Sequence, residues 1–128
     1  MKQLNPYLIF SGNCKEAMTF YQTCLGGEIA LMQTFAESPI DVPDEHQNRI
    51  FNSILKSDNI LIMASDDLPT HPVKIGTNVS LFVNFPDQTE QQNTFTKLSE
   101  GGTIIMPLEG SFGMLTDKYG IQWMFARE

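Results

Sequence analysis

The stretch EAMTFYQTCLGGEI, residues 16–29, has a counterpart 75 residues further along the chain, QQNTFTKLSEGGTI at 91–104. Five of the fourteen aligned positions are identical, including the glycine pair near the end of each copy. Each copy follows a short apolar run and precedes other runs of the same kind. The repetition therefore indicates that one structural module occurs twice in the chain.

Each copy of the repeat predicts a helix with recognisable ends. Asn13 and Asp87 stand just before the two copies, and both residue types commonly cap helix N-termini. Apolar residues then recur at helical spacing. The pairs Gly26-Gly27 and Gly101-Gly102 are typical of a left-handed stop at a helix C-terminus. We expect two helices of similar length, one in each half.

Strand-like runs surround both predicted helices, three of them after each glycine pair. The runs cover residues 7–10, 28–35, 49–56 and 59–65 in the first half, and 79–85, 103–108, 112–117 and 121–126 in the second. This order predicts an α+β fold of two βαβββ modules, which form a half-open mixed β-barrel with the helices on its outer face. We expect one domain over 1–128, with module 1 at about 1–66, a linker at about 67–76 and module 2 at about 77–128.

Composition excludes several classes of protein. The 128 residues carry a net charge of −7, from 15 acidic and 8 basic side chains, and the cations are scattered. Nucleic-acid binding needs clustered cations, so we expect no nucleic-acid partner. No apolar run approaches the ~18 residues of a membrane span, and the N-terminus does not resemble a signal peptide. We therefore expect a cytoplasmic protein without a membrane partner.

Four segments resemble a known family. They are PYLIFSGNCKEAMTFYQTCLGGEI (6–29), LIMASD (61–66), GGTIIMPLE (101–109) and FGMLTDKYGIQWM (112–124). They resemble the PhnB-like branch of the vicinal oxygen chelate superfamily, which includes glyoxalase I, bleomycin-resistance proteins and extradiol dioxygenases. Domains of this branch are sometimes labelled 3-demethylubiquinone-9 3-methyltransferase. The resemblance covers nearly the whole chain and implies a homodimer with sites formed where modules meet.

The resemblance also implies positions for metal ligands, and this chain departs from all of them. The His expected near the start of the first strand falls at Pro6, or at Asn5 with a shift of one. Residues 77–81 contain no His or carboxylate, and the Glu expected four residues after Gly120 is Met124. A divalent metal needs several N, O or S donors. We therefore predict no metal and no cofactor.

The function predicted on this basis is binding of a small molecule in an apolar cavity without a metal. The alternative is a lyase, isomerase or transferase with atypical metal ligands or none. Strand alternation assigns the faces: if Pro6 faces the cavity, so do Leu8 and Phe10, whereas Tyr7 and Ile9 face the helix. The ligand-binding candidates are Leu8, Phe10, Asn52, Met63, Phe112, Met114, Gln122 and Met124.

The last strand illustrates the alternatives that the sequence leaves open. If Met124 faces the cavity, so does Gln122, whereas Trp123 and Phe125 pack beneath the helix. Met124 could equally fill the core, and Gln122 could simply form structural hydrogen bonds. The Asp117–Gly120 segment is expected to form the preceding tight turn.

Other chemically interesting residues have a structural reading as well as a functional one. Asp66 fits a turn or a helix cap better than a catalytic acid. Cys14 would begin the first helix, whose dipole can lower a thiol pKa, but a buried and inert thiol is the simpler reading. Cys14 and Cys24 would lie ~15 Å apart on one helix, too far for a disulfide. The polar loop at 36–48 is long enough to be functional or mobile.

Overall fold

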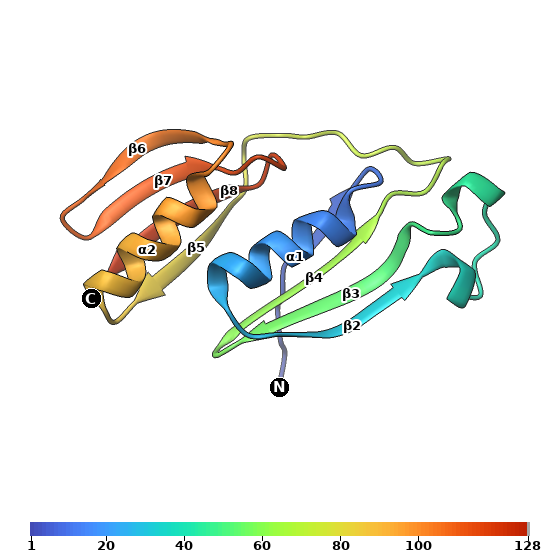
Figure 1. The fold of residues 1–128 in the computed structure, drawn as a ribbon, viewed down its shortest axis with the longest axis horizontal. Helices are drawn as coiled ribbons and strands as arrows, with labels where there is room; N and C mark the ends of the chain where they lie inside the picture. Colours follow the sequence, from blue (N-terminus) through green and yellow to red (C-terminus); the bar gives the residue numbers. More distant parts are fainter. Residues whose placement is uncertain (128) are drawn as a thin grey trace. The chain divides into compact units, whose positions relative to one another are not determined.

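In the computed structural model, which describes residues 1–127, the chain divides into two compact units between Lys74 and Ile75. Each unit contains one four-stranded mixed sheet and one long helix (Figure 1). The α+β class and the two βαβββ modules are therefore confirmed. No helix within residues 1–127 is both long and apolar enough to cross a bilayer.

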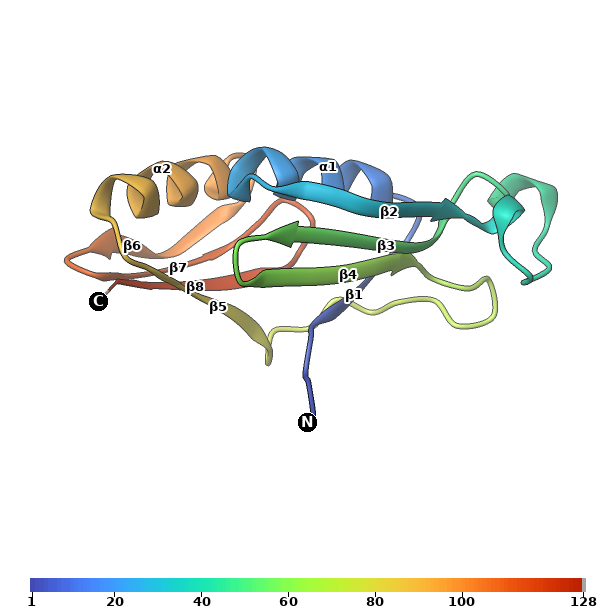
Figure 2. The ribbon, with the colours of Figure 1, turned by 90° about the horizontal axis from the view of Figure 1, so that it is seen from below.

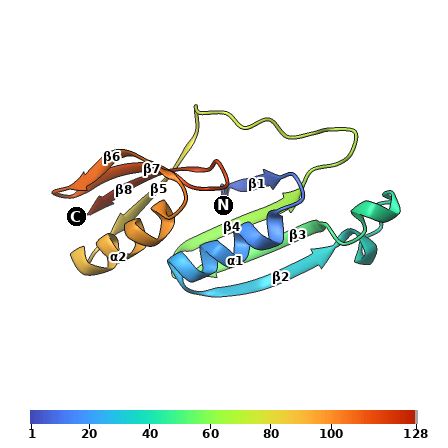
Figure 3. The ribbon, with the colours of Figure 1, turned by 45° about the horizontal axis from the view of Figure 1, so that its top comes forward.

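The first unit contains β1 (Tyr7–Phe10), α1 (Cys14–Leu25), β2 (Glu28–Thr34), β3 (Ile50–Ser57) and β4 (Ile60–Asp66). Its strands are arranged in the order β1-β4-β3-β2, with β1 parallel to β4 and the other pairs antiparallel. The helix α1 packs against β2, β3 and β4 (Figure 3). The helix α1 covers one face of this sheet, and no other long helix belongs to residues 1–74 (Figure 2).

The second unit repeats this arrangement with β5 (Ser80–Phe85), α2 (Gln88–Ser99), β6 (Thr103–Glu109), β7 (Phe112–Thr116) and β8 (Gln122–Arg127). The strand order is β5-β8-β7-β6, and β5 is parallel to β8. Both sheets are open, with β1 and β2 at the edges of the first and β5 and β6 at the edges of the second.

The two helices begin at the predicted residues but are capped differently. The carboxylate of Asp87 accepts a hydrogen bond from the backbone N–H of Glu90 at 2.8 Å, as expected of an N-cap. Asn13 is also the N-cap residue, but its side chain makes no capping hydrogen bond. The prediction that Asn13 caps α1 was therefore wrong in its chemistry. The cap is Asp66, whose Oδ1 accepts from the N–H of Cys14 at 3.0 Å.

The two glycines of each pair differ in how closely the sheet approaches them. Gly26 and Gly101 adopt positive φ angles of 78° and 74°, which lets the chain leave the helix as predicted. Gly27 and Gly102 approach a strand closely: a Cβ atom on Gly27 would overlap the backbone of β3, and one on Gly102 the backbone of β7. The second glycine therefore allows the turn to pack against the sheet, and Gly27, with a φ angle of 89°, also contributes to the turn itself.

The core of the second unit confirms the faces assigned to β8. Trp123 and Phe125 are fully buried, and the Phe125 ring lies 5.2 Å from that of Phe95 on α2. The indole N–H of Trp123 donates to Asp117 Oδ2 at 2.8 Å. A large buried side chain of this kind contributes roughly 1.5–3 kcal/mol. The bulk of the last strand thus holds α2 on its sheet.

Candidate functional site

The first unit contains a pocket of about 390 Å³. Ligand-binding pockets are usually about 300–1,000 Å³, so this one suits a small organic molecule. Five of its residues are purely apolar, and the other five bring hydroxyl, carboxylate and imidazole groups. The lining residues are Tyr7, Ile9, Phe35, Ile40, Phe51, Ser65, Asp66, Asp67, Leu68 and His71.

Two neighbouring strands provide one side of the pocket. Ile9 of β1 pairs with Ser65 of β4, and Tyr7 pairs with Met63. Paired residues in a sheet point to the same face, and successive residues alternate. Ile9, Ser65 and Tyr7 therefore lie on one face, and the buried Phe10 and Ala64 lie on the opposite face, towards α1.

An irregularity in β3 supplies the aromatic side of the pocket. Gln33 of β2 pairs with Asn52, but the next residue, Thr34, pairs with Ile50, so Phe51 has no partner of its own. Such a bulge redirects a side chain. The Phe51 ring contacts that of Phe35 edge-on, with 5.6 Å between the ring centroids. Two aromatic side chains thus stand together in the pocket wall.

The loop predicted at 36–48 supplies Ile40 to the pocket and is partly structured. It contains two short 3-10 helices, Phe35–Glu37 and Asp44–His46. Its ends are joined by hydrogen bonds from the backbone N–H of Phe35 to Arg49 O and from that of Ala36 to Gln47 O, at 2.9 and 3.0 Å. These bonds hold the base of the loop closed beside β3.

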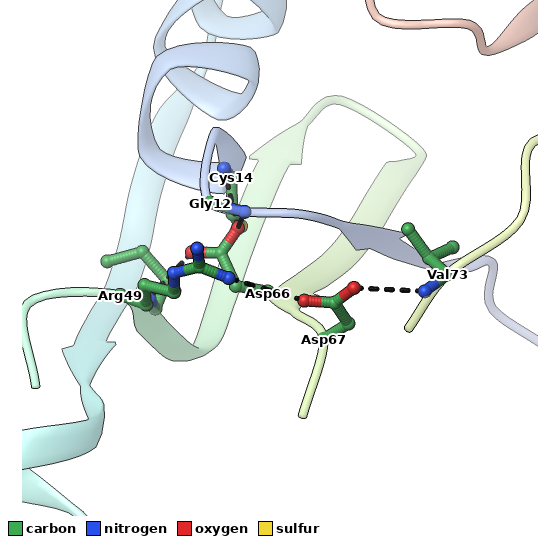
Figure 4. A network of polar contacts seen from close by, with 7 residues as sticks. Gly12, Cys14, Arg49, Asp66, Asp67 and Val73 are labelled. Atoms are coloured by element: carbon green, nitrogen blue, oxygen red, sulfur yellow. Dashed lines mark hydrogen bonds and ion pairs between the residues drawn. The ribbon is translucent and has the colours of Figure 1, made fainter. Parts of the chain in front are cut away.

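Asp66 lines the pocket, and its carboxylate is fully engaged by backbone hydrogen bonds. Its Oδ1 accepts hydrogen bonds from the N–H groups of Gly12 at 2.8 Å and Cys14 at 3.0 Å (Figure 4). Its Oδ2 accepts from the N–H of Ile50 at 2.8 Å. One buried carboxylate thus joins the turn before α1, the start of β3 and the end of β4. This confirms the reading of Asp66 as a helix cap.

Asp67 is engaged less fully than Asp66. Its Oδ2 accepts from the backbone N–H of Val73 at 2.9 Å, whereas its Oδ1 lies 3.5 Å from Arg49 Nη1 (Figure 4). A separation of 3.5 Å is at the outer limit for a hydrogen bond. The carboxylate therefore retains capacity to accept another hydrogen bond at the pocket.

Three other polar groups reach the pocket. Ser65 is only 7% exposed, and its hydroxyl has no hydrogen-bond partner among residues 1–127. The Tyr7 hydroxyl donates to Asn52 Oδ1 at a long 3.4 Å. The Nδ1 atom of His71 lies 3.0 Å from the Thr70 hydroxyl. The Ser65 hydroxyl is therefore available to a molecule in the pocket, as donor or acceptor.

Cys14 is the first residue of α1, and its side chain is fully buried. Burial raises the pKa of its thiol to about 12, and the nearby Asp66 carboxylate adds to the shift, while a contact with Ser53 opposes it. The thiol Sγ lies 3.7 Å from the Ser53 hydroxyl. Desolvation thus outweighs the hydrogen-bonding contact with Ser53. Both Cys14 and Cys24 are buried free thiols, as predicted.

The predicted face of β1 was wrong. Phe10 is 4% exposed and its ring lies 6.4 Å from that of Tyr21 on α1, so Phe10 faces the helix rather than a cavity. Leu8, two residues earlier, lies on the same face. The residues that line the pocket are instead Tyr7 and Ile9. One signal was available in the sequence: a tyrosine has a polar tip and tends to remain partly exposed.

Asn52 and Met63 lie on the pocket-side face of the first sheet without lining the pocket itself. Met63 pairs with Tyr7, and Asn52 accepts the hydrogen bond from the same tyrosine. Both residues are half-buried. Their role as ligand contacts therefore stays a prediction.

The other four candidates lie on the sheet of the second unit, on the face away from α2. Met114 pairs with Met124, and Thr116 pairs with Gln122. Gln122 also donates a hydrogen bond to the backbone oxygen of Val79 at 2.9 Å, so it has the structural role left open by the sequence. Phe112 is two residues before Met114 and shares its face.

The donor side chains do not fit the metal centre that the superfamily resemblance implies. Within residues 1–127, no three His, Cys, Asp or Glu side chains are grouped closely enough to hold a metal ion. The implied ligand positions carry Asn5 or Pro6, Met124 and the non-ligating residues 77–81. The chemistry of the site must therefore be derived from the pocket's own side chains.

Comparison with known proteins agrees with this architecture. The family profile described as 3-demethylubiquinone-9 3-methyltransferase matches residues 2–126. The chain belongs to this family. The predicted PhnB-like resemblance is thus confirmed, and the family description carries over no more than membership.

Several relatives match this chain over nearly the whole length of both proteins. Protein YjdN of Escherichia coli K12 is 29% identical, with 94% of this chain and 92% of YjdN covered. The crystal structure of PA1353 from Pseudomonas aeruginosa has 36% identity and a TM-score of 0.91, covering 100% of this chain and 98% of that one. A fosfomycin-resistance protein, FosX from Listeria monocytogenes, has 9% identity, a TM-score of 0.68, and coverage of 99% and 91%. At that identity the likeness shows the fold alone.

Proposed function

We propose that this chain binds a small, largely apolar molecule in the pocket of its first unit, without a metal. The observation that carries the proposal is the pocket of about 390 Å³ with an aromatic and aliphatic wall and a few polar groups at one end. This is the usual composition of a ligand site: apolar surface supplies affinity, and a few polar groups fix orientation. Asn52 and Met63 would contact parts of a ligand that extend beyond the pocket.

The exposed sheet face of the second unit supports the rest of the proposal. Phe82, Met124, Met114 and Met106 form one row across its four strands, and Phe82 and Met106 are 60% and 47% exposed. Methionine side chains adapt to varied partners. We propose that Phe112, Met114, Gln122 and Met124 contribute to a binding surface there.

We also propose that the chain forms a homodimer, because exposed apolar rows of this kind commonly mark interfaces. We propose a cytoplasmic location as well, because no apolar run of the sequence approaches the length of a membrane span. Light scattering at micromolar concentration should give twice the 14.4 kDa of one chain. A mass near 14.4 kDa would refute the dimer.

A thermal-shift screen of metabolites and drugs tests the binding proposal. A ligand at a hundred times its Kd stabilises the protein by about 2.7 kcal/mol, which raises Tm by several degrees. Ile9→Trp would fill the pocket from an exposed strand position. Leu31→Trp is the matched control, because Leu31 is similarly exposed in the same unit but does not line the pocket.

Ligands that act through the pocket should stabilise the wild type and Leu31→Trp but not Ile9→Trp. Compounds that stabilise all three proteins equally would bind elsewhere. If every stabilising compound behaves in that way, the pocket is not the binding site and the proposal fails.

A second candidate is an enzyme, a lyase, isomerase or transferase that works without the superfamily's metal ligands. The observation in its favour is that Asp67 and His71 both line the pocket. A carboxylate and an imidazole can move protons. Mass spectrometry of compounds from the screen after incubation with the wild type and His71→Asn tests this. Unchanged compounds in both incubations would leave binding as the function.

A further inference from the structure

We propose that the pocket of the first unit selects small aryl-ammonium compounds: an aromatic body against Phe51 and Phe35, with a cationic amino group at Asp67 and Ser65. The inference rests on the proposed binding function and specifies the chemical class of the ligand. It follows from which polar groups of the pocket still have hydrogen-bonding capacity, and from the charge around them.

The two aspartates at the polar end differ in that capacity. Asp66 already accepts three backbone hydrogen bonds of 2.8–3.0 Å and has little left to offer. Asp67 accepts one good bond, from Val73, and a marginal one from Arg49 at 3.5 Å. A charged donor placed in the pocket would therefore bind Asp67. Hydrogen bonds between charged groups are about twice as strong as neutral ones.

Ser65 supplies an independent observation beside Asp67. It is more than nine-tenths buried, lines the pocket, and has no hydrogen-bond partner among residues 1–127. A hydroxyl can accept from an ammonium group through its lone pairs. An ammonium has three N–H donors, so one group can satisfy Ser65 and Asp67 together. The pocket thus contains two acceptors, two residues apart in the chain, that retain hydrogen-bonding capacity.

The charge around the pocket favours a cation over an anion. None of the described residues that line the pocket is Lys or Arg, although the Arg49 guanidinium lies 3.5 Å from Asp67 Oδ1. The loop at 36–48 carries four carboxylates and no Lys or Arg. Residues 1–74 contain nine Asp and Glu against five Lys and Arg, a net charge of −4. A negative field of this kind repels anions and attracts cations.

The opposite side of the pocket suits an aromatic body. Phe51 and Phe35 meet edge-on, and Ile9 and Ile40 complete the apolar wall. Offset or edge-on ring contacts add about 0.5–1.5 kcal/mol to the burial of apolar area. Tyr7 also lines the pocket, and the face of a ring attracts a cation near it.

Three indole compounds with the same two methylene groups between the ring and the polar group test the inference. Tryptamine carries an ammonium group at pH 7, tryptophol a neutral hydroxyl and indole-3-propionate a carboxylate. Isothermal titration should show tryptamine binding at least about tenfold more tightly than tryptophol, the factor expected for a charge-assisted hydrogen bond. Indole-3-propionate should bind most weakly. Ile9→Trp should abolish binding of all three.

Two variants test whether Asp67 and Ser65 cause the preference for a cationic ligand. Asp67→Asn should weaken tryptamine roughly tenfold to a hundredfold and leave tryptophol within about threefold. Ser65→Ala should weaken tryptamine by about three- to tenfold. Glu28→Gln removes the same charge from an exposed position of β2 outside the pocket, and it should leave both affinities unchanged. Circular dichroism melts would verify that Asp67→Asn folds, and the comparison of probes on the wild type needs no variant.

The contrary results distinguish a failure of the aryl-ammonium inference from a failure of the proposed binding function. If all three probes bind the wild type equally and Ile9→Trp abolishes them, the pocket binds ligands but the preference for cations is wrong. The same holds if tryptophol binds as tightly as tryptamine, or if Asp67→Asn leaves tryptamine unaffected. If none of the probes binds at millimolar concentration, the aryl-ammonium inference is overturned, whereas the library screen with Ile9→Trp still decides the binding function.

Discussion

Replacing Asp66 should damage the fold more than replacing any exposed carboxylate. Asp66 accepts hydrogen bonds from three backbone N–H groups that come from three separate places in the chain, residues 12, 14 and 50. The residue is buried at the end of β4. In Asp66→Ala all three donors lose their partner, and α1 loses the negative charge at its N-terminus.

The magnitude follows from the count of lost bonds. An unsatisfied buried donor costs about 1–3 kcal/mol, so with three donors Asp66→Ala should lose at least about 3 kcal/mol. Asp66→Asn keeps the shape and one acceptor oxygen, which can still serve Gly12 and Cys14. Its NH₂ group would then face the N–H of Ile50, so one bond is lost and two donors oppose each other. We expect a loss of about 2–3 kcal/mol.

Urea unfolding followed by circular dichroism measures both variants. With a slope of about 1.5 kcal/mol/M, a loss of 3 kcal/mol lowers the midpoint by roughly 2 M. Asp87→Asn is the matched control, because Asp87 is an exposed cap that accepts one bond and Asn caps helices equally well. Its stability should change by less than about 0.5 kcal/mol. An Asp66→Asn protein as stable as Asp87→Asn would refute the reasoning.

Three other changes test further parts of the fold. The pKa of the Cys14 thiol is raised to about 12 from 9.0, so its stabilising contribution is complete below pH 9 and declines as the pH rises towards 12. Urea unfolding should show the wild type losing about 1.4 kcal/mol more than Cys14→Ala between pH 8 and 10, and equal losses would contradict the shift. Trp123→Phe removes the donor to Asp117 at 2.8 Å and should lower the unfolding free energy by about 2–4 kcal/mol; a change below about 1 kcal/mol would count against that bond. Gly27→Ala should lower the unfolding free energy by more than about 2 kcal/mol, because its Cβ would overlap the backbone of β3. Gly26→Ala has open space around the new Cβ and should lose only about 1 kcal/mol. Equal melting temperatures of the two variants would show that the overlap is relieved.

Much of the first unit's local structure was predictable, but its site was not. The glycine pairs and the runs of apolar residues placed α1, α2 and the eight strands within a few residues, because these signals act over short distances. The alternation along YLIF was also correct, yet its phase was wrong. The phase is set by which side chain meets α1, and the packing of Phe10 on Tyr21 decides it.

The pocket residues could not be found for a related reason. Phe51 enters the wall because β3 has a bulge opposite Gln33 and Thr34, and a bulge depends on the pairing of two strands. Asp67 and Ser65 were parts of an ordinary-looking Ser-Asp-Asp strand end. Only their neighbours show that Asp66 is saturated while Ser65 and Asp67 retain hydrogen-bonding capacity.

The sequence by itself determined the βαβββ repeat, the ends of both helices, the family, and the lack of ligating side chains at the implied metal positions. These properties depend on residue identity, short-range turn chemistry and periodicity. The tertiary structure alone decided which face of β1 lines the pocket, which residue caps α1, and which acceptors remain available. Each of these depends on contacts between residues far apart in the chain, such as Asp66 with the backbone at residues 12 and 50. Local sequence patterns do not reveal such long-range partners.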